Sequence, residues 1–317
     1  MNFPVFDLHC DTALALLGED HNSAGSLGNN NYHVDLERGK TLPGYAQCFA
    51  CFTSEKMYEW YGVSPIVIFE RELATIQREV DRHRKTIALA YDVRDIQNNL
   101  EKGKMSAILT LEGTAGIGYD PQLLQDLCLI GFRMVSLTWN ENNPLAGSHL
   151  TGGGLTEQGK EFVKEAQRLG MIVDVSHLSD EGFWDIINIT NAPTVASHSN
   201  SRTIHNVSRN LTDDMFQALC QTGGVAGLNM YQEFIGPQAD LDKACDHILH
   251  FLEMDPDAKH IALGCDLDGC DRLAYGFEGV QSYPVLASRL LERGLTEDMV
   301  QNIFFNNAMG VMNTCCM

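Results

Sequence analysis

The sequence is short of basic residues. Its 317 residues contain 22 Lys and Arg against 42 Asp and Glu, which gives a formal net charge of −20 at pH 7. A surface this acidic repels phosphate backbones and anionic lipid headgroups. We therefore expect neither a nucleic acid nor a membrane surface as a partner.

Long apolar runs are also missing. No window approaches the roughly 18 uninterrupted apolar residues of a membrane-spanning helix. Asp7, His9 and Asp11 fall where the apolar segment of a secretion signal would lie, and no basic segment precedes them. A secretion signal is therefore not predicted.

The ten cysteines of a long chain without a predicted leader indicate reduced thiols and a cytoplasmic location. Cys48 and Cys51 lie inside an apolar run and are interpreted as buried strand residues. Cys315 and Cys316 are expected on a frayed C-terminal tail.

Apolar runs of strand length recur eight times. They are rich in Val, Ile and Leu without strict polar alternation, which is typical of strands buried on both faces. The predicted strands are Val5–His9, Tyr45–Phe52, Met105–Glu112, Phe132–Thr138, Met171–His177, Thr194–His198, Gly224–Asn229 and Ile261–Asp266.

Stretches with helical periodicity separate these runs, at Ser64–His83, Leu155–Leu169, Thr212–Gln221, Asp240–Glu253 and Thr296–Met312. Eight strand–helix units predict an α/β fold, a (β/α)₈ barrel of the TIM type. Such barrels take about 250 residues, so we expect insertions in the early loops. His21–Lys40 is polar and is predicted to be a surface loop. No linker divides the chain, and one domain over residues 1–317 is expected.

Side chains that can bind metal end several predicted strands. His9 and Asp11 are two residues apart, so in an extended strand they project to the same side. Glu112, His177, His198, Asp266 and Asp268 follow at the ends of later strands. The strand ends of a barrel meet on one face, where active sites lie.

Such a cluster predicts a metal site, because burying several carboxylates without a cation costs several kcal/mol each. Three histidines with carboxylates favour zinc or a similar transition-metal ion over magnesium or calcium. We expect five of these side chains to bind metal directly, which is more than a single tetrahedral catalytic zinc uses. Two ions that share a carboxylate would account for the surplus. Glu112 is the natural bridge, since its two oxygens can divide between the ions.

Ordered motifs recur along nearly the whole chain: Asp7-Leu-His-Cys-Asp-Thr12, Leu111-Glu-Gly113, Gly154-Leu-Thr156, Asp174-Val-Ser-His177, Ser197-His-Ser199, Arg209-Asn-Leu-Thr-Asp-Asp214, Gly223-Gly224 and Asp266-Leu-Asp-Gly269. With these motifs the sequence resembles the renal (membrane) dipeptidase family of zinc dipeptidases with an amidohydrolase-like barrel. The resemblance implies one zinc on His9, Asp11 and Glu112, and a second on Glu112, His177 and His198. It also implies a hydroxide between the ions and a possible homodimer.

The resemblance implies a mechanism as well. Hydroxide would attack the peptide carbonyl of a dipeptide, including one with a D-residue at its C-terminal position. Asp266 would carry the proton to the departing amine. Asp268 is the rival for that role, although a structural role in a turn is expected for it. Arg209 matches the residue that binds the terminal carboxylate of the substrate, since its planar fork fits both oxygens.

The sequence departs from the renal pattern at one position. A histidine that contacts the scissile carbonyl is replaced by Trp139, followed by Asn140. An indole donates a hydrogen bond but cannot accept one, so help at the carbonyl is left to zinc or to Asn140 or Asn142. Trp139 and Asn140 are therefore predicted to contact substrate, and the range of substrates is open.

Three further histidines, at positions 149, 205 and 247, are interpreted as solvent or loop residues, and Gly152-Gly-Gly154 as a tight turn. Two alternatives to a dipeptidase stay open. One is another barrel metallohydrolase acting on cyclic amides, lactams or phosphotriesters, although none of the predicted strands ends in the bridging lysine that such enzymes often use. The other is a non-catalytic metal-binding relative.

Overall fold

The computed structural model describes residues 1–18 and 25–316. Their strands form one parallel sheet: β1 Val5–Cys10, β2 Tyr45–Phe52, β3 Ile87–Leu89, β4 Met105–Glu112, β5 Phe132–Ser136, β6 Ile172–Asp174, β7 Thr194–Val195, β8 Ala226–Leu228 and β9 Ile261–Leu263. The order is β7-β6-β5-β4-β2-β1-β9-β8, and β3 pairs with the first residues of β4. A parallel bridge between Ala196 and Ala226 brings the two ends of this order together. The eight remaining strands form a nearly closed barrel, as predicted.

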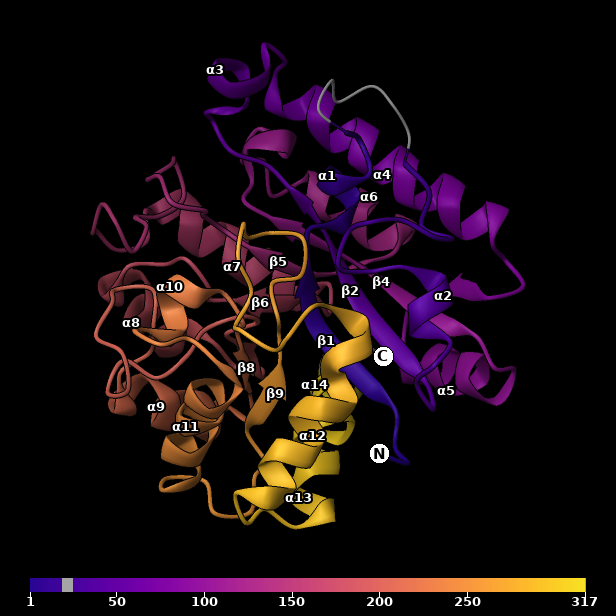
Figure 1. Ribbon diagram of the computed structural model, residues 1–317. Helices are drawn as coiled ribbons and strands as arrows, with labels where there is room; N and C mark the ends of the chain where they lie inside the picture. Colours follow the sequence, from indigo (N-terminus) through magenta and orange to yellow (C-terminus); the bar gives the residue numbers. More distant parts are fainter. Residues whose placement is uncertain (19–24, 317) are drawn as a thin grey trace.

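Helices surround the barrel (Figure 1). The α-helices are α1 Thr12–Ala15, α2 Leu36–Gly39, α3 Met57–Tyr61, α4 Pro65–Arg82, α5 Val93–Glu101, α6 Leu123–Ile130, α7 Glu157–Arg168, α8 Asp180–Ile189, α9 Asp213–Thr222, α10 Gln232–Ile235, α11 Leu241–Leu252, α12 Tyr283–Glu292, α13 Glu297–Gln301 and α14 Asn307–Cys315. Short 3₁₀ turns are η1 Ala115–Ile117 and η2 Val280–Ser282, and η3 Asn302–Asn306 is π-helical. Among the described residues, no helix is both long and apolar enough to span a bilayer.

The predicted helices form, and several begin where their side chains cap them. Thr156, Thr212 and Asp240 accept hydrogen bonds from backbone N–H groups three residues later. The C-terminal prediction needs a correction, because Thr296–Met312 is not one α-helix but α13 and α14 joined by the π-helical η3. The extra early elements are α1 and α2 before β2, and α3, α4, β3 and α5 before β4, which agrees with the expected early insertions.

Of the three hydrophobic clusters among the described residues, the two larger ones hold the barrel together. The larger lies between strands and helices. The smaller takes residues from seven of the eight barrel strands, including Phe6, Ile108 and Met134, and Val225 directly before β8, and is therefore the barrel interior. Helix α14 packs against it through Val311 and Met312. Cys316 is also buried there, so the prediction of a frayed tail is wrong at this residue.

Two other expectations about burial can be checked. Cys48 and Cys51 are buried in β2, as predicted, and all ten cysteines lie within the described residues as free thiols. The expected surface loop His21–Lys40 is corrected: residues 21–24 lie outside the described part, but Leu27, Val34 and Leu36 are fully buried. The polar composition around these three apolar residues concealed their burial.

Candidate metal centre

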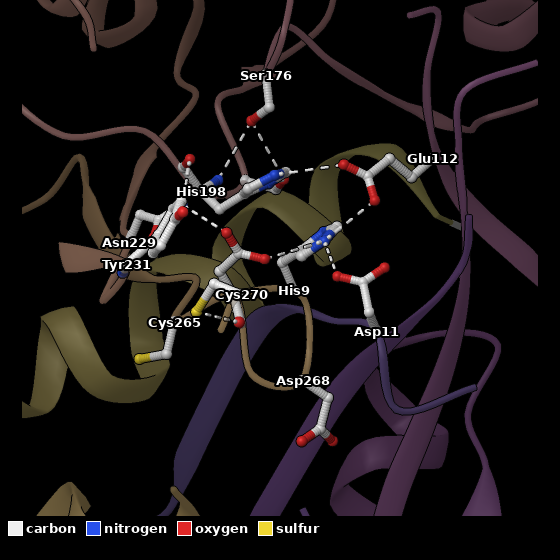
Figure 2. A network of polar contacts seen from close by, with 12 residues as sticks. His9, Asp11, Glu112, Ser176, His198, Asn229, Tyr231, Cys265, Asp268 and Cys270 are labelled. Carbon is white, nitrogen blue, oxygen red and sulfur yellow. Dashed lines mark hydrogen bonds and ion pairs between the residues drawn. The ribbon is translucent and has the colours of Figure 1, made fainter. Parts of the chain in front are cut away.

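The side chains expected to bind metal converge at the carboxyl ends of the barrel strands (Figure 2). Nε2 of His9 lies 3.2 Å from Asp11 Oδ2 and 3.4 Å from Glu112 Oε2. The other Glu112 oxygen, Oε1, lies 2.9 Å from His177 Nε2 and 3.5 Å from His198 Nε2. The two oxygens of one carboxylate thus face two different sets of imidazoles.

Local structure places these residues. Glu112 is the last residue of β4, and His9 precedes the last residue of β1. The predicted bounds of three later strands are wrong: β6, β7 and β9 end three residues before His177, His198 and Asp266. His177 and Asp266 have φ values of 70° and 58°. This left-handed conformation cannot continue a strand, and it is uncommon outside glycine.

Asp266 and Asp268 have different surroundings. Oδ1 of Asp266 lies 4.0 Å from His9 Nε2, and its Oδ2 accepts a hydrogen bond from Asn229 Nδ2 at 3.0 Å. Asp268 instead accepts bonds from Thr12 Oγ1 at 2.6 Å and from the backbone N–H of His33 at 2.5 Å. Its carboxylate points away from His9 in Figure 2. Asp268 therefore links its own loop to the start of α1 and to the segment that contains His33.

Glycine at position 269 keeps room above the two carboxylates. A Cβ there would lie 2.2 Å from Asp11 Oδ2 and 2.2 Å from Asp266 Oδ1. No side chain can be added at that distance without moving the carboxylates. The space next to these oxygens is therefore kept free of protein atoms by the glycine.

Hydrogen bonds fix which imidazole nitrogens carry protons. Ser197 Oγ donates to Asp174 Oδ2 at 2.5 Å, so it accepts from His198 Nδ1 at 2.6 Å. Asn140 Oδ1, which can only accept, lies 2.9 Å from His177 Nδ1. Both histidines therefore carry their proton on Nδ1, and both Nε2 atoms present lone pairs to the cluster.

This arrangement is unfavourable without a cation. The two Nε2 lone pairs of His177 and His198 face each other at 3.0 Å, beside Glu112. Asp11 Oδ1 is buried and has no hydrogen-bond partner. Within residues 1–18 and 25–316, two groups of three have ligand atoms that all lie within 4.8 Å of one another: His9, Glu112 and His198, and His9, Asp11 and Asp266. The donor set fits transition-metal ions such as zinc.

The pKa shifts of these side chains also favour a bound cation. Burial raises the pKa of Glu112 to about 7, since the positive charge of His9 offsets burial only in part and Asp11 adds to it. Burial lowers the pKa of His9, but the carboxylates of Glu112 and Asp11 outweigh it and raise the pKa well above its usual value. Burial, with the nearby cationic groups, lowers the pKa values of His177 and His198 well below 6.5. These two imidazoles are therefore neutral and ready to bind a metal.

A pocket of about 370 Å³ opens above the cluster. Its lining includes the predicted Trp139 and Asn140, together with Asp11, Glu112 and Asp266. This volume lies within the range of small-molecule sites. The pocket can accept a small ligand directly over the metal-binding side chains.

Arg209 is buried next to the cluster, with 3% of its surface exposed. Nη1 donates to Ser199 Oγ at 2.6 Å, while Nε and Nη2 have no hydrogen-bond partner. The guanidinium lies 5.5 Å from the ring centroid of Phe234. Burial lowers the pKa of Arg209, although Asp266, Asp174 and Glu112 partly offset this. A buried guanidinium with two unused donors is suited to binding an anion.

Comparison with protein families decides the identity. The model of the membrane dipeptidase family, peptidase family M19, matches residues 1–315. The chain belongs to this family. It is a dipeptidase of the metallopeptidase class, which confirms the family, the barrel fold and the enzyme class expected from the sequence.

Individual members of the family agree with this match. An uncharacterized dipeptidase of Schizosaccharomyces pombe is 32% identical over 300 residues, covering 88% of this chain and 71% of the relative. The crystal structure of dipeptidase AC, a metallo peptidase of family M19, is 25% identical with a TM-score of 0.88, and covers 100% of this chain and 99% of that one. A metallo peptidase from Rhodobacter sphaeroides, liganded with a phosphinate mimic of L-Ala-D-Ala, has a TM-score of 0.87 at 24% identity, covering 99% and 100%.

In this family member, the sequence interpretation missed His149. It lies in a loop, as expected, but it is half-buried and paired: Nε2 lies 2.8 Å from Asn140 Oδ1 and Nδ1 lies 2.9 Å from Ser208 Oγ. His149 thus shares the Asn140 oxygen with His177. The pair is nine residues apart in a loop without periodicity, so no sequence signal linked them.

His247 is a second correction. It is fully buried on α11, where it accepts from the backbone N–H of Ser201 and contacts the carbonyl of Ile235. His205 does lie in a loop, as expected. The turn predicted at Gly152-Gly-Gly154 is present, with positive φ at its first two residues.

Proposed function

We propose that this dipeptidase cleaves its substrate with two zinc ions, one held by His9, Asp11 and Glu112 and the other by Glu112, His177 and His198. The observation that carries the proposal is the division of Glu112, whose Oε2 faces His9 while Oε1 faces His177 and His198. Bound metal ions would supply an activated water and polarise the scissile carbonyl.

The protein's own residues have distinct roles in this proposal. Asp266 takes up a proton and delivers it to the departing amine, because it lines the pocket and its pKa is raised, chiefly by burial. Arg209 binds the terminal carboxylate through Nε and Nη2. Asn140 holds the Nδ1 proton of His177, and so keeps Nε2 available as a ligand.

The substrate is a dipeptide, including one with a D-residue at the C-terminal position. The Rhodobacter sphaeroides structure with its L-Ala-D-Ala mimic supports this range by similarity of fold. Trp139, in place of the histidine expected from the renal pattern, lines the pocket without offering an acceptor atom.

Metal analysis combined with a substrate panel tests the proposal. The protein should bind two equivalents of zinc and hydrolyse L-Ala-L-Ala or L-Ala-D-Ala. Binding of only one equivalent of zinc at saturation would contradict the proposal that two ions share the Glu112 carboxylate. Binding of dipeptides with no hydrolysis would favour the non-catalytic alternative.

The cytoplasmic location, the single domain and the homodimer stay predictions. Ten free thiols are compatible with a reducing compartment. Cell fractionation tests the location, and sedimentation of the purified chain tests the oligomeric state. Limited proteolysis tests the single domain.

A further inference from the structure

One wall of the pocket above the metal centre consists of uncharged, mostly aromatic side chains. Trp60 and Tyr61 come from α3, and Phe52 ends β2. Trp139 stands edge-on to both Trp60 and Phe52, with ring centroids 5.5 and 5.2 Å away. Leu14 of α1 completes the wall. These five residues are called the aromatic wall.

The aromatic wall is not a sealed core. Trp60 keeps 39% of its surface exposed at the pocket, and Leu14, Tyr61 and Trp139 are only partly buried. Lys56 lies near Trp60, 6.0 Å from the ring, but it pairs with Glu141 at 3.2 Å. Aromatic surface left open beside a ligand cavity gains stability when an apolar group covers it.

Leu14 of the aromatic wall and Arg209 lie at different ends of the cluster, while Trp139 lies beside His177, with ring centroids 6.2 Å apart. A chain of contacts runs from Asp11 to His9 and Glu112, then to His198, whose neighbour Ser199 accepts a hydrogen bond from Arg209. Leu14 lies one helical turn from Asp11, whereas Phe234 packs under Arg209. The ring of Tyr231 lies 5.0 Å from that of Phe234, and in Figure 2 Asp11 and Tyr231 are on opposite sides of His9.

We propose that the aromatic wall receives the side chain of the N-terminal residue of the dipeptide, and that Trp60 makes the enzyme selective for a bulky apolar residue there. This rests on the proposed function, in which Arg209 holds the C-terminal carboxylate. With that end fixed at Phe234, the first residue of the substrate extends toward Leu14 and α3. Among the described residues, no lysine or arginine lines the pocket at the aromatic wall, so an acidic first residue finds no counter-charge there.

The test compares four dipeptides with the same C-terminal alanine: L-Phe-L-Ala, L-Ala-L-Ala, L-Asp-L-Ala and L-Lys-L-Ala. For the zinc-loaded wild type, kcat/KM should be highest for L-Phe-L-Ala. Trp60→Ala should lower that value about tenfold and change the value for L-Ala-L-Ala less than about twofold, because alanine does not reach the indole.

Trp184→Ala is the matched control. Trp184 on α8 is 38% exposed and packs edge-on to Phe183, outside the pocket lining. This variant should keep the wild-type preference. Equal loss on L-Phe-L-Ala and L-Ala-L-Ala in Trp60→Ala would overturn the inference, and so would a wild type that prefers L-Asp-L-Ala or L-Lys-L-Ala.

Failure of the proposed function gives a different result. A zinc-loaded wild type that hydrolyses none of the four dipeptides contradicts the proposed hydrolysis. Calorimetry with two non-hydrolysable phosphinate analogues, one with a benzyl and one with a methyl first side chain, then tests the wall by itself. About tenfold tighter binding of the benzyl analogue, lost in Trp60→Ala, supports the inference; equal affinities overturn it.

Discussion

Arg209 offers the sharpest test of how substrate is held. Arg209→Met keeps an apolar stem of similar length and removes the guanidinium. In the structure, the guanidinium is buried and donates one hydrogen bond, to Ser199, while Nε and Nη2 lack partners. Burial lowers its pKa, so the folded protein holds this charge at a cost until an anion arrives.

The size of the effect follows from those two free donors. A hydrogen bond to a charged group contributes about 1.5–3 kcal/mol, so two such bonds to the substrate carboxylate contribute about 3–6 kcal/mol. We expect kcat/KM for a dipeptide to fall by at least about 10²-fold. Stability should not fall with it, because the substitution removes two unsatisfied buried groups costing about 1–3 kcal/mol each.

A dipeptide amide, which lacks the terminal carboxylate, isolates this interaction. Wild type should prefer the free dipeptide to its amide by about 10²-fold or more, and Arg209→Met should lose this preference while keeping its Tm. Arg202→Met is the control, since Arg202 is already paired with Asp180 at 2.7 Å. A variant with a lower Tm and an undiminished preference would refute the reasoning and make Arg209 a structural residue.

The other predictions concern the metal centre. Glu112→Ala should lose both metal ions, measured as zinc equivalents after dialysis, because one of its oxygens faces His9 and the other faces His177. Asp266→Asn should retain zinc, and its kcat should fall about 10²–10⁴-fold. Asp268→Asn should chiefly lower Tm, because the Asp268 carboxylate accepts hydrogen bonds from Thr12 and His33. His149→Ala should weaken binding of one zinc about tenfold or more by loosening Asn140. Zinc affinity should fall as the pH drops through about 7, because Glu112, with its pKa raised to about 7, gains a proton that must leave before metal binds. The raised pKa of His9, which must also lose a proton to bind metal, should let the affinity keep rising above pH 7.

Each of these has a result that would count against it. Retention of one zinc in Glu112→Ala would mean that the carboxylate serves a single ion. Equal kcat losses in the two asparagine variants would leave Asp266 without a special role. Unchanged zinc binding in His149→Ala would make its contact with Asn140 incidental. A zinc affinity that is flat between pH 5 and pH 8 would remove Glu112 from the coordination.

The barrel and the cluster at its strand ends could be predicted because both depend on local patterns. Runs of buried apolar residues marked the barrel strands, and a chemically distinctive side chain followed each relevant run. The bounds of β6 and β9 could not be predicted, since the positive φ of His177 and Asp266 is set by tertiary contacts. Strand β3 has only three residues, too few for a periodic signal. The burial of His247 depends on partners 12 and 46 residues away.

The least predictable groups are those that give the ligands their direction. His177 depends on Asn140 from the loop after β5, and His198 depends on Ser197 and, through it, on Asp174 of β6. Without these partners, either imidazole could carry its proton on Nε2, facing Glu112. This tautomer would relieve the repulsion between the two Nε2 lone pairs. The fold instead holds the lone pairs together at an energetic cost, which a bound cation would reverse. The site is therefore specified as much by the acceptors behind the histidines as by the histidines themselves.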